Sequence, residues 1–355
     1  MTLQVALIGA GAIAREQHLP AWFKLSSAQV VAVAEPSSEA LAAIPAELHI
    51  GRRVGDYRRV LEDPTIDAVD ICVPSALHAE VIIASLNADK HVLCEKPMAT
   101  SAADAAAILK AWRASGKKLM IGQHMRFEPS VERLVGYLGR HPPGDVYYAR
   151  GQWLRRRRLP GRPGFTNRAL SGGGALYDIG VHVLDLAWWL MGCPRPTVAS
   201  GAVFNKLAKR TDLGSEWGQW DPASFDVEDF AAGLIRFENG AALTLEASWL
   251  ALQPVDEFYR VQLFGTEAGV VWPDGVISCE EERTPSDVTL SPTTGQRAHH
   301  RVIQEFARAV LDDLPVPVPP EQSATVIAML DALYRSSATG RECDVVAVAK
   351  EAEVR

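Results

Sequence analysis

A lysine, an aspartate and a histidine in two separate motifs are the residues best suited to acid–base chemistry. Lys96 lies in Cys94-Glu95-Lys96-Pro97, and Asp178 and His182 lie four residues apart after Gly172-Gly173-Gly174. Residues four apart share one face of a helix, so Asp178 can orient the imidazole while the imidazole takes a hydroxyl proton. The lysine ammonium can stabilise a developing alkoxide. The plainer alternatives are a surface lysine and a buried histidine with satisfied hydrogen bonds.

A glycine-rich turn near the start of the chain has the spacing of a dinucleotide-binding loop. Gly9-Ala10-Gly11-Ala12-Ile13-Ala14 follows an apolar run at residues 3–8 and precedes a helical stretch. In the G-x-G-x-x-G/A fingerprint, Gly9 makes the tight turn, Gly11 lets the backbone approach a pyrophosphate, and small Ala14 allows close packing. We therefore expect Gly9, Gly11, Ala12 and Ile13 to bind the cofactor. A glycine-rich turn without a ligand is the alternative.

Glu35 closes the next apolar run and bears on which dinucleotide is bound. A carboxylate there can accept hydrogen bonds from the adenosine ribose hydroxyls and repels a 2′-phosphate. The following residue is Pro36, so no cation directly follows the acid. We predict NAD rather than NADP, although Arg52 and Arg53 could approach a phosphate. The alternative is a solvated acid at a strand end.

Arginines are the candidate contacts for a charged group on a substrate. The run Trp153-Leu154-Arg155-Arg156-Arg157-Arg158 ends a strand-like segment, and arginine binds carboxylate or phosphate well. Because a strand alternates faces, at most about two of these side chains point to one side, and a solvated edge or an oligomer contact remains open. Arg168 is the better candidate, since it precedes the helix that carries Asp178.

The elements that must position these residues fall into two patterns. The first third alternates apolar runs with helical stretches, which indicates a parallel sheet with helices on both faces. The runs lie at residues 3–8, 30–34, 68–73, 91–94 and 118–122. Beyond about residue 125, helical stretches at 131–138 and 175–190 are followed by strand-like runs. These lie at residues 198–204, 230–237, 241–249, 259–264 and 269–272.

An Asn-Gly pair at residues 239–240 predicts a hairpin, and a mostly antiparallel α+β domain is expected. Residues 205–226 are predicted to form a long loop. Two further helices are predicted near the end of the chain, at residues 302–311 and 324–336. Whether they pack back on the first domain stays open.

Composition excludes several classes of partner. The 355 residues carry a formal net charge of -7, which disfavours nucleic acid and anionic membranes. We expect no transmembrane helix and no secretory signal. Five scattered cysteines fit a reducing cytoplasm. A metal site from Asp178, His182 and Asp185 lacks a thiolate or second histidine, so no metal is predicted.

With these motifs the chain resembles the Gfo/Idh/MocA family of NAD(P)-dependent oxidoreductases over nearly its whole length. The shared segments are GAGAIA (9–14), VPSALHAEVI (73–82), EKPMA (95–99), RFEPSV (126–131), GGGALYDIGVHVLDLAWWLMG (172–192), VEDFAAGLIRFENGA (227–241) and ALYRSSATGR (332–341). The pairing of EKP with GGG-x-L-x-D-x-G-x-H is the most specific of them.

The resemblance implies a Rossmann domain at residues 1–124 and an α+β domain at 125–355. The large open sheet of the second domain lies over the nicotinamide and often forms the oligomer interface, so a homo-oligomer, a dimer or tetramer, is expected. The catalytic set implied is Lys96, Asp178 and His182. Further residues implied in cofactor binding are Val73, Pro74, Ser75, His78, Glu95 and Lys96. Arg126, Arg155 and Arg168 are carried as substrate candidates.

Some positions depart from the family pattern. Ser75 stands where Asn is common, and Gln123 and His124 replace more usual residues, so substrate contacts there do not transfer. We expect an NAD-dependent dehydrogenase that acts on a secondary alcohol of a sugar, polyol or related polyhydroxy compound. The alternatives are a glycosidase that retains NAD and a non-catalytic dinucleotide-binding regulator.

Overall fold

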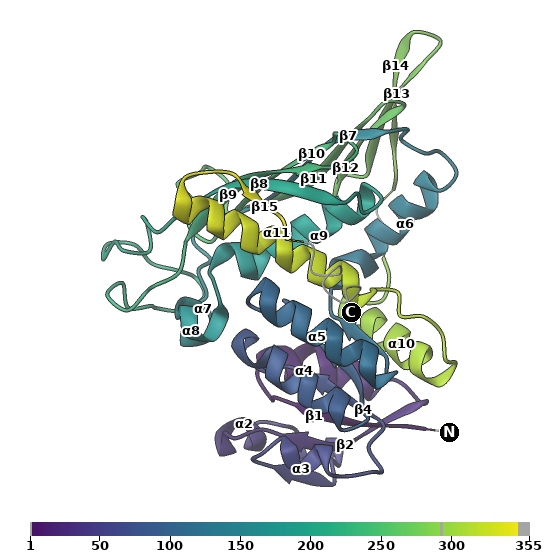
Figure 1. Cartoon of the computed structure of the whole chain (residues 1–355), viewed down its shortest axis with the longest axis vertical. Helices are drawn as coiled ribbons and strands as arrows, with labels where there is room; N and C mark the ends of the chain where they lie inside the picture. Colours follow the sequence, from purple (N-terminus) through teal and green to yellow (C-terminus); the bar gives the residue numbers. More distant parts are fainter. Residues whose placement is uncertain (1, 292–293, 347–355) are drawn as a thin grey trace.

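The computed structural model describes residues 2–291 and 294–346 and contains two sheets with helices between and around them. In Figure 1 the smaller sheet lies at the bottom and the larger sheet at the top. Residues 347–355, which belong to the predicted second domain, lie outside the described residues. No helix in the described ranges has the length and apolarity needed to cross a membrane.

The N-terminal sheet is parallel and has the strand order of a dinucleotide-binding fold, β3-β2-β1-β4-β5-β6. Its strands are β1 (Leu3–Ile8), β2 (Ala28–Ala34), β3 (Arg52–Val54), β4 (Ala68–Ile71), β5 (His91–Cys94) and β6 (Leu119–Ile121). The chain order reverses beside β1, so the carboxyl ends of β1 and β4 border a crevice where such folds bind ligands. This confirms the predicted Rossmann architecture.

Alternation along these strands supplies two apolar faces. Val5 and Leu7 join one buried cluster with helices α1 (Leu19–Trp22) and α10 (Ala298–Leu311). Ala6 and Ile8 join another with α4 (His78–Asn87) and α5 (Ala102–Ser115). The short helices α2 (Ser38–Ala42) and α3 (Arg58–Leu61) complete this half. Helix α10, which follows the second sheet in the chain, therefore packs on the first sheet, with Phe306 edge-on to Trp22.

The second sheet has nine strands in the order β14-β13-β12-β11-β7-β10-β9-β8-β15. They are β7 (Val146–Arg155), β8 (Pro196–Phe204), β9 (Phe230–Phe237), β10 (Ala242–Ser248), β11 (Glu257–Gly265), β12 (Ala268–Trp272), β13 (Val276–Glu281), β14 (Thr284–Thr289) and β15 (Cys343–Asp344). Only β7 and β10 pair in parallel among these described strands. This confirms the expected large, mostly antiparallel sheet.

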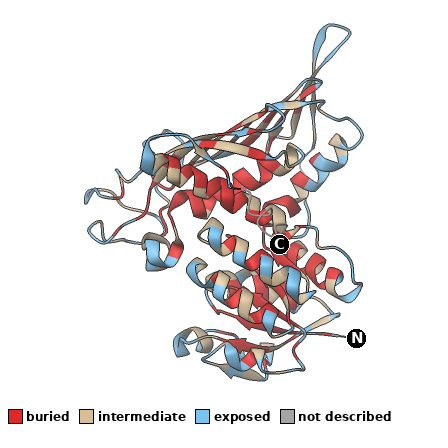
Figure 2. Ribbon diagram, viewed as in Figure 1, coloured by how far each residue is buried: buried red, intermediate tan, exposed pale blue. Residues whose placement is uncertain are grey.

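Helices cover one face of this sheet and leave the other open. The covering helices are α6 (Pro129–Leu138), α9 (Val181–Leu190) and α11 (Pro320–Thr339), and the short helices α7 (Pro163–Thr166) and α8 (Arg168–Ser171) lie at the side. Figures 1 and 2 show α9 and α11, largely buried, between the two sheets. Gly201 in β8 lets α11 pack close to the sheet, since a Cβ at this position would lie 2.6 Å from the Leu333 carbonyl oxygen.

Candidate active site between the two sheets

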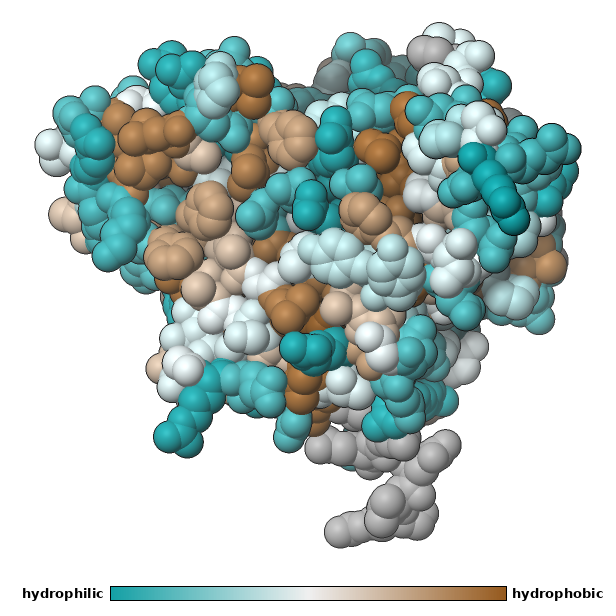
Figure 3. Space-filling view, turned by 90° about the horizontal axis from the view of Figure 1, so that it is seen from above, coloured by the Kyte–Doolittle hydropathy of each residue, from teal (hydrophilic) through white to brown (hydrophobic). Residues whose placement is uncertain are grey.

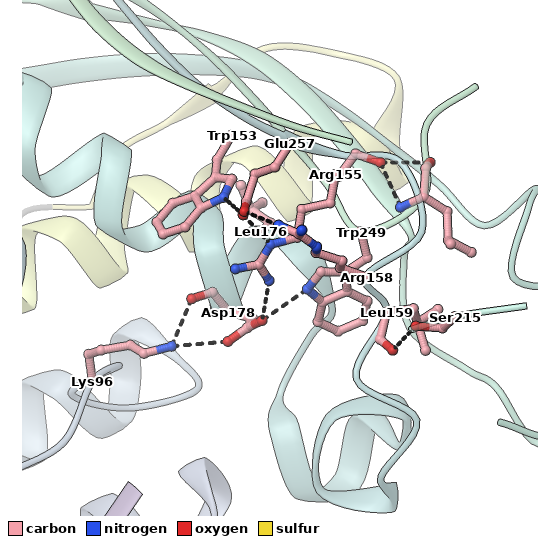
Figure 4. A network of polar contacts seen from close by, with 12 residues as sticks. Lys96, Trp153, Arg155, Arg158, Leu159, Leu176, Asp178, Ser215, Trp249 and Glu257 are labelled. Carbon is pink, nitrogen blue, oxygen red and sulfur yellow. Dashed lines mark hydrogen bonds and ion pairs between the residues drawn. The ribbon is translucent and has the colours of Figure 1, made fainter. Parts of the chain in front are cut away.

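The predicted lysine and aspartate meet where the Rossmann sheet faces the second domain. Lys96 follows β5, and its Nζ donates to the Asp178 carbonyl oxygen at 2.7 Å and to the Asp178 carboxylate at 3.1 Å. Figure 4 shows Lys96 reaching up to Asp178 from the lower domain. Both side chains keep a little exposure, 17% and 15%. The two motifs, 82 residues apart, therefore form one site.

Asp178 is held as a carboxylate by several donors. Besides Lys96, Trp249 Nε1 donates to its Oδ2 at 2.9 Å, and Arg155 lies 3.9 Å from the same oxygen. Burial favours the neutral acid, but the charges of Lys96 and Arg155 outweigh burial and lower the pKa of Asp178. Asp178 is therefore ionised at neutral pH.

The predicted contact between Asp178 and His182 is not formed in this structure. Among the described residues no hydrogen bond joins the two, because Lys96 and Trp249 occupy the carboxylate. His182 instead lies edge-on to His124, with ring centroids 4.7 Å apart, and 5.8 Å from the Trp153 ring. Burial, and then the charge of Lys96, lowers the pKa of His182 well below its ordinary value. His182 is thus a neutral imidazole that can accept a proton.

A glutamate that the sequence did not single out fixes the start of the catalytic helix. The carboxylate of Glu228 accepts from the backbone N–H groups of Gly174 and Leu176, each at 2.9 Å, and from the Tyr334 hydroxyl at 2.7 Å. These N–H groups open the π-helical turn η5 (Leu176–Gly180), where backbone donors are otherwise unpaired. Glu228 therefore positions the turn that carries Asp178.

The three glycines before this turn are required by close approaches. A Cβ on Gly172 would lie 2.5 Å from Thr100, and one on Gly173 would lie 2.1 Å from the Tyr334 hydroxyl. Thr100 closely follows the EKP segment, so the glycine loop packs directly against the chain that carries Lys96. A larger side chain here would push the two halves of the site apart.

The N-terminal glycine-rich turn at residues 9–14 has the features that a dinucleotide needs. Gly9 has φ +93°, and a Cβ there would lie 2.5 Å from the Cys72 carbonyl oxygen, whereas nothing lies within 4 Å of the Cβ position of Gly11. Helical turns begin at Ala12 and Ile13 and continue to Trp22. The residues present thus fit a pyrophosphate beside Gly11 at the start of a helix.

Glu35 lies beside this loop. Its carboxylate accepts from the Ala10 N–H and the Ser37 N–H, each at 2.8 Å. The two arginines named as possible phosphate contacts are bound elsewhere: Arg52 to Asp63, and Arg53 to the Leu41 carbonyl oxygen. The position of Glu35 suits a ribose contact.

The other implied cofactor residues surround the end of β4 and β5. Val73, Pro74 and Ser75 follow β4, and Ser75 begins a short 3₁₀ turn. His78 is 1% exposed, and its ring nitrogens lie 2.6 Å from the Pro97 carbonyl and 3.0 Å from the Val73 carbonyl. His78 therefore ties the two segments together from beneath rather than presenting its ring to the crevice.

Glu95 belongs to a buried network that sequence reasoning missed. His18 Nε2 lies 2.9 Å from Glu95, and its Nδ1 lies 2.8 Å from Asp70, which also accepts from Trp22. Burial opposes protonation of His18, but the charge of Asp70 outweighs burial and raises the pKa of His18 well above its usual value. A buried imidazolium thus bridges two carboxylates directly behind Lys96.

Cys72 completes a group with His18 and Asp70 whose polar atoms lie within 4.8 Å of one another. Burial raises the pKa of the Cys72 thiol to about 12. A protonated thiol is a poor metal ligand, so this group is better explained as a hydrogen-bonded network.

The three arginines predicted to contact a substrate have different surroundings in the structure. Arg126 is 4% exposed and makes two hydrogen bonds to Asp185, at 2.6 and 2.9 Å. Its charge is thus neutralised by Asp185, so Arg126 is a structural residue rather than the predicted substrate contact. Arg168 is exposed and lies over Tyr334, 5.4 Å from the ring centroid, next to the glycines at residues 172–174.

Arg155 is the arginine that reaches the catalytic residues. It is 7% exposed and bonds Glu257 at 2.8 Å, while Arg158 shares the same carboxylate at 2.5 Å. Arg156 and Arg157 are exposed. Two of the four arginines thus reach Glu257, but strand alternation does not account for this division, because β7 ends at Arg155. Figure 4 shows Arg155 and Glu257 beside Asp178.

Two family models match the chain on either side of this site. The model described as "Oxidoreductase family, NAD-binding Rossmann fold" matches residues 3–123, and the "GFO/IDH/MocA C-terminal domain" matches residues 142–271. The chain belongs to the Gfo/Idh/MocA oxidoreductases. The first match includes Lys96, and the second includes Asp178 and His182. The family resemblance drawn from the motifs is confirmed, and the protein is an enzyme of the oxidoreductase class.

Known members of the family are similar over most of this chain. D-glucoside 3-dehydrogenase of Escherichia coli (strain K12) is 29% identical over 343 residues, 97% of either protein. Levoglucosan dehydrogenase of Pseudarthrobacter phenanthrenivorans is 29% identical over 289 residues, 76% of this chain and 73% of that protein. A solved levoglucosan dehydrogenase in complex with NADH has the same fold, with a TM-score of 0.83 at 24% identity over 98% of this chain and 100% of that one.

Proposed function

We propose that the protein is an NAD-dependent dehydrogenase that acts on a secondary alcohol of a sugar, polyol or related polyhydroxy compound. The observation that carries this proposal is the meeting of Lys96 with the Asp178 carboxylate, in a site that also holds the neutral imidazole of His182. The named relatives that act on glucosides and levoglucosan support a sugar substrate. Bound NAD supplies the hydride acceptor.

The protein's own residues supply positioning and proton transfer. His182 takes the proton of the substrate hydroxyl, since its lowered pKa keeps it neutral. Lys96 stabilises the negative charge that develops on the same oxygen. Asp178 holds the ammonium of Lys96 in place and balances its charge, a role that differs from the expected orientation of His182.

We propose NAD as the preferred cofactor because the Glu35 carboxylate lies where the adenosine ribose is expected. Its backbone partners, Ala10 and Ser37, place it against the glycine loop. A 2′-phosphate there would meet this negative charge, while Arg52 is paired with Asp63.

We further propose that the open face of the nine-stranded sheet forms the contact between copies in a homo-oligomer. Leu154 and Phe258 pair across β7 and β11 on this face and are only partly buried, and Phe204 on the neighbouring part of the sheet is 41% exposed. Figure 3, which views the molecule from this side, shows hydrophobic patches among polar groups. Leu154→Glu should reduce the mass measured by light scattering after size exclusion. A monomeric wild-type protein would contradict this proposal.

The proposed reaction is tested by following NADH formation with a panel of glycosides, free sugars, polyols and inositols. Net NADH formation that depends on the sugar supports a dehydrogenase. A glycosidase would release the aglycone without net NADH, and a regulator would bind NAD and turn over nothing. Either outcome would replace the proposal.

A further inference from the structure

An arginine held between two tryptophans lies next to the catalytic residues. The Arg155 guanidinium lies 5.0 Å from the Trp153 ring centroid and 4.4 Å from that of Trp217. Trp153 also approaches His182, and Arg155 approaches Asp178. The tryptophans and Arg155 therefore form one wall beside the groups that would react with a substrate.

The loop that carries Trp217 is fixed to the segment that follows β7. Ser215 Oγ donates to the Leu159 carbonyl at 2.6 Å, and the Glu216 N–H donates to the Arg157 carbonyl at 2.9 Å. Glu216 also pairs with Arg158 at 3.2 Å. Trp217 nevertheless keeps 46% of its surface exposed. An exposed aromatic ring held in place beside a reaction centre is suited to binding a ligand.

The charges along this wall are balanced. Arg155 and Arg158 share the carboxylate of Glu257, and Arg158 has Glu216 in addition. Burial opposes ionisation of Glu257, but hydrogen bonds from Arg155 and Trp153 outweigh burial and lower its pKa. Together with the pair of Lys96 and Asp178, the site contains three cations and three carboxylates. No cation of this described group is left without an acidic partner.

We propose that the wall formed by Trp153, Arg155, Trp217 and Glu257 is the sugar-binding subsite, and that it selects an uncharged sugar ring over a sugar acid. The indole faces can pack against ring C–H groups, and the paired Arg155 and Glu257 offer donors and acceptors to hydroxyls. A substrate carboxylate would meet Glu257 and Asp178, and it would have to displace them from Arg155. This inference rests on the proposed dehydrogenase function, and it replaces the expectation that the arginines bind an anionic group.

Removing the shared carboxylate tests the charge argument. Methyl β-D-glucopyranoside and the corresponding glucuronide differ only in the group at C6, so they form a matched pair of probes. Their affinity for the enzyme–NADH complex is measured by the change in NADH fluorescence. The wild type should bind the neutral probe at least tenfold more tightly. Glu257→Gln removes the carboxylate 2.8 Å from Arg155 and leaves this arginine only the more distant Asp178, while Arg158 keeps Glu216. The ratio should therefore shift toward the acid by tenfold or more.

Two further variants control the result. Glu238→Gln makes the same change in net charge at an exposed residue paired with Arg195 and should leave the ratio unchanged. Trp217→Ala should weaken binding of the neutral probe roughly tenfold, with partial recovery in Trp217→Phe and unchanged NADH affinity.

The outcomes distinguish this inference from the proposed function. A wild type that prefers the glucuronide, that binds neither probe, or whose ratio is unmoved by Glu257→Gln overturns the subsite. Selective binding of the glucoside without NADH formation from any sugar would leave the subsite standing and overturn the dehydrogenase.

Discussion

Replacing Asp178 by asparagine separates two roles for this residue. The change keeps the size of the side chain and one acceptor for Trp249, but it removes the charge that faces Lys96 at 3.1 Å and Arg155 at 3.9 Å. Breaking a fully buried ion pair costs about 3–5 kcal/mol. Because Asp178 and Lys96 keep 15% and 17% exposure, and asparagine still accepts a hydrogen bond, we expect a loss of about 2–3 kcal/mol.

The stability loss has a defined pH dependence. The pKa of Asp178 is lowered in the folded protein, so its ionisation stabilises the fold above the unfolded value of about 3.9. That contribution is lost as pH falls through the folded pKa. Urea unfolding should therefore show a constant difference between wild type and Asp178→Asn near neutral pH, narrowing below about pH 4. Asp274→Asn, at an exposed pair with Arg260, is the control.

The kinetic effect identifies the partner through which Asp178 acts. Lys96 without its carboxylate is less well positioned, and we expect kcat to fall roughly tenfold to a hundredfold. In a double-mutant cycle, Asp178→Asn should add little to Lys96→Met, because both remove the same arrangement, and should add nearly fully to His182→Ala. Full additivity with Lys96→Met, together with strong coupling to His182→Ala, would show that Asp178 orients the histidine after all.

Three further predictions concern the cofactor, the catalytic turn and the base. NAD should give a higher kcat/KM than NADP, and Glu35→Gln should narrow the difference; a wild-type preference for NADP in steady-state kinetics would contradict this. Glu228→Gln keeps an oxygen at Oε1 for Gly174, Leu176 and Tyr334 but removes the carboxylate charge and places an amide donor where Oε2 accepts from Gly174. We therefore expect kcat to fall about tenfold while NADH affinity is unchanged; an unchanged kcat would make Glu228 purely structural. Because burial and the charge of Lys96 lower the pKa of His182, this base stays neutral at pH values below the ordinary histidine pKa of about 6.5. We therefore expect kcat/KM to be constant between about pH 6.5 and 8. A fall in kcat/KM centred near pH 6.5 would contradict the assigned environment.

Local patterns predicted most of the regular structure. The runs at residues 3–8 and 91–94 coincide with β1 and β5, and the Asn-Gly turn joins β9 to β10. The loop at 205–226 contains neither helix nor strand among its described residues. These features depend on alternation and turn chemistry within a few residues.

The hairpin of β13 and β14 was missed because its sequence lacks both signals. Its strands are rich in polar residues, and Glu282 and Arg283 have φ of +50° and +64° at a turn where glycine or asparagine is usual. The division at residue 124 stays a prediction. The first sheet ends with β6 and the second begins with β7.

In the site, motifs predicted which residues come together but not how they pair. The i, i+4 spacing favoured a contact between Asp178 and His182, yet Lys96, 82 residues away, takes the carboxylate. Likewise, Arg126 pairs with Asp185 across 59 residues and Glu228 caps a turn 52 residues earlier. Such pairings depend on the packing of distant segments, which spacing within one motif does not contain.

The most direct test is NADH formation by wild type, His182→Ala and Lys96→Met on the best sugar found in the panel, with NAD affinity measured in parallel. Wild-type protein should form NADH in proportion to the sugar consumed. His182→Ala should slow turnover by roughly 10²–10⁴-fold, and Lys96→Met should slow it as well, while NAD affinity changes little in either. Near-normal turnover in His182→Ala, or sugar consumption by the wild type without NADH, would contradict the account.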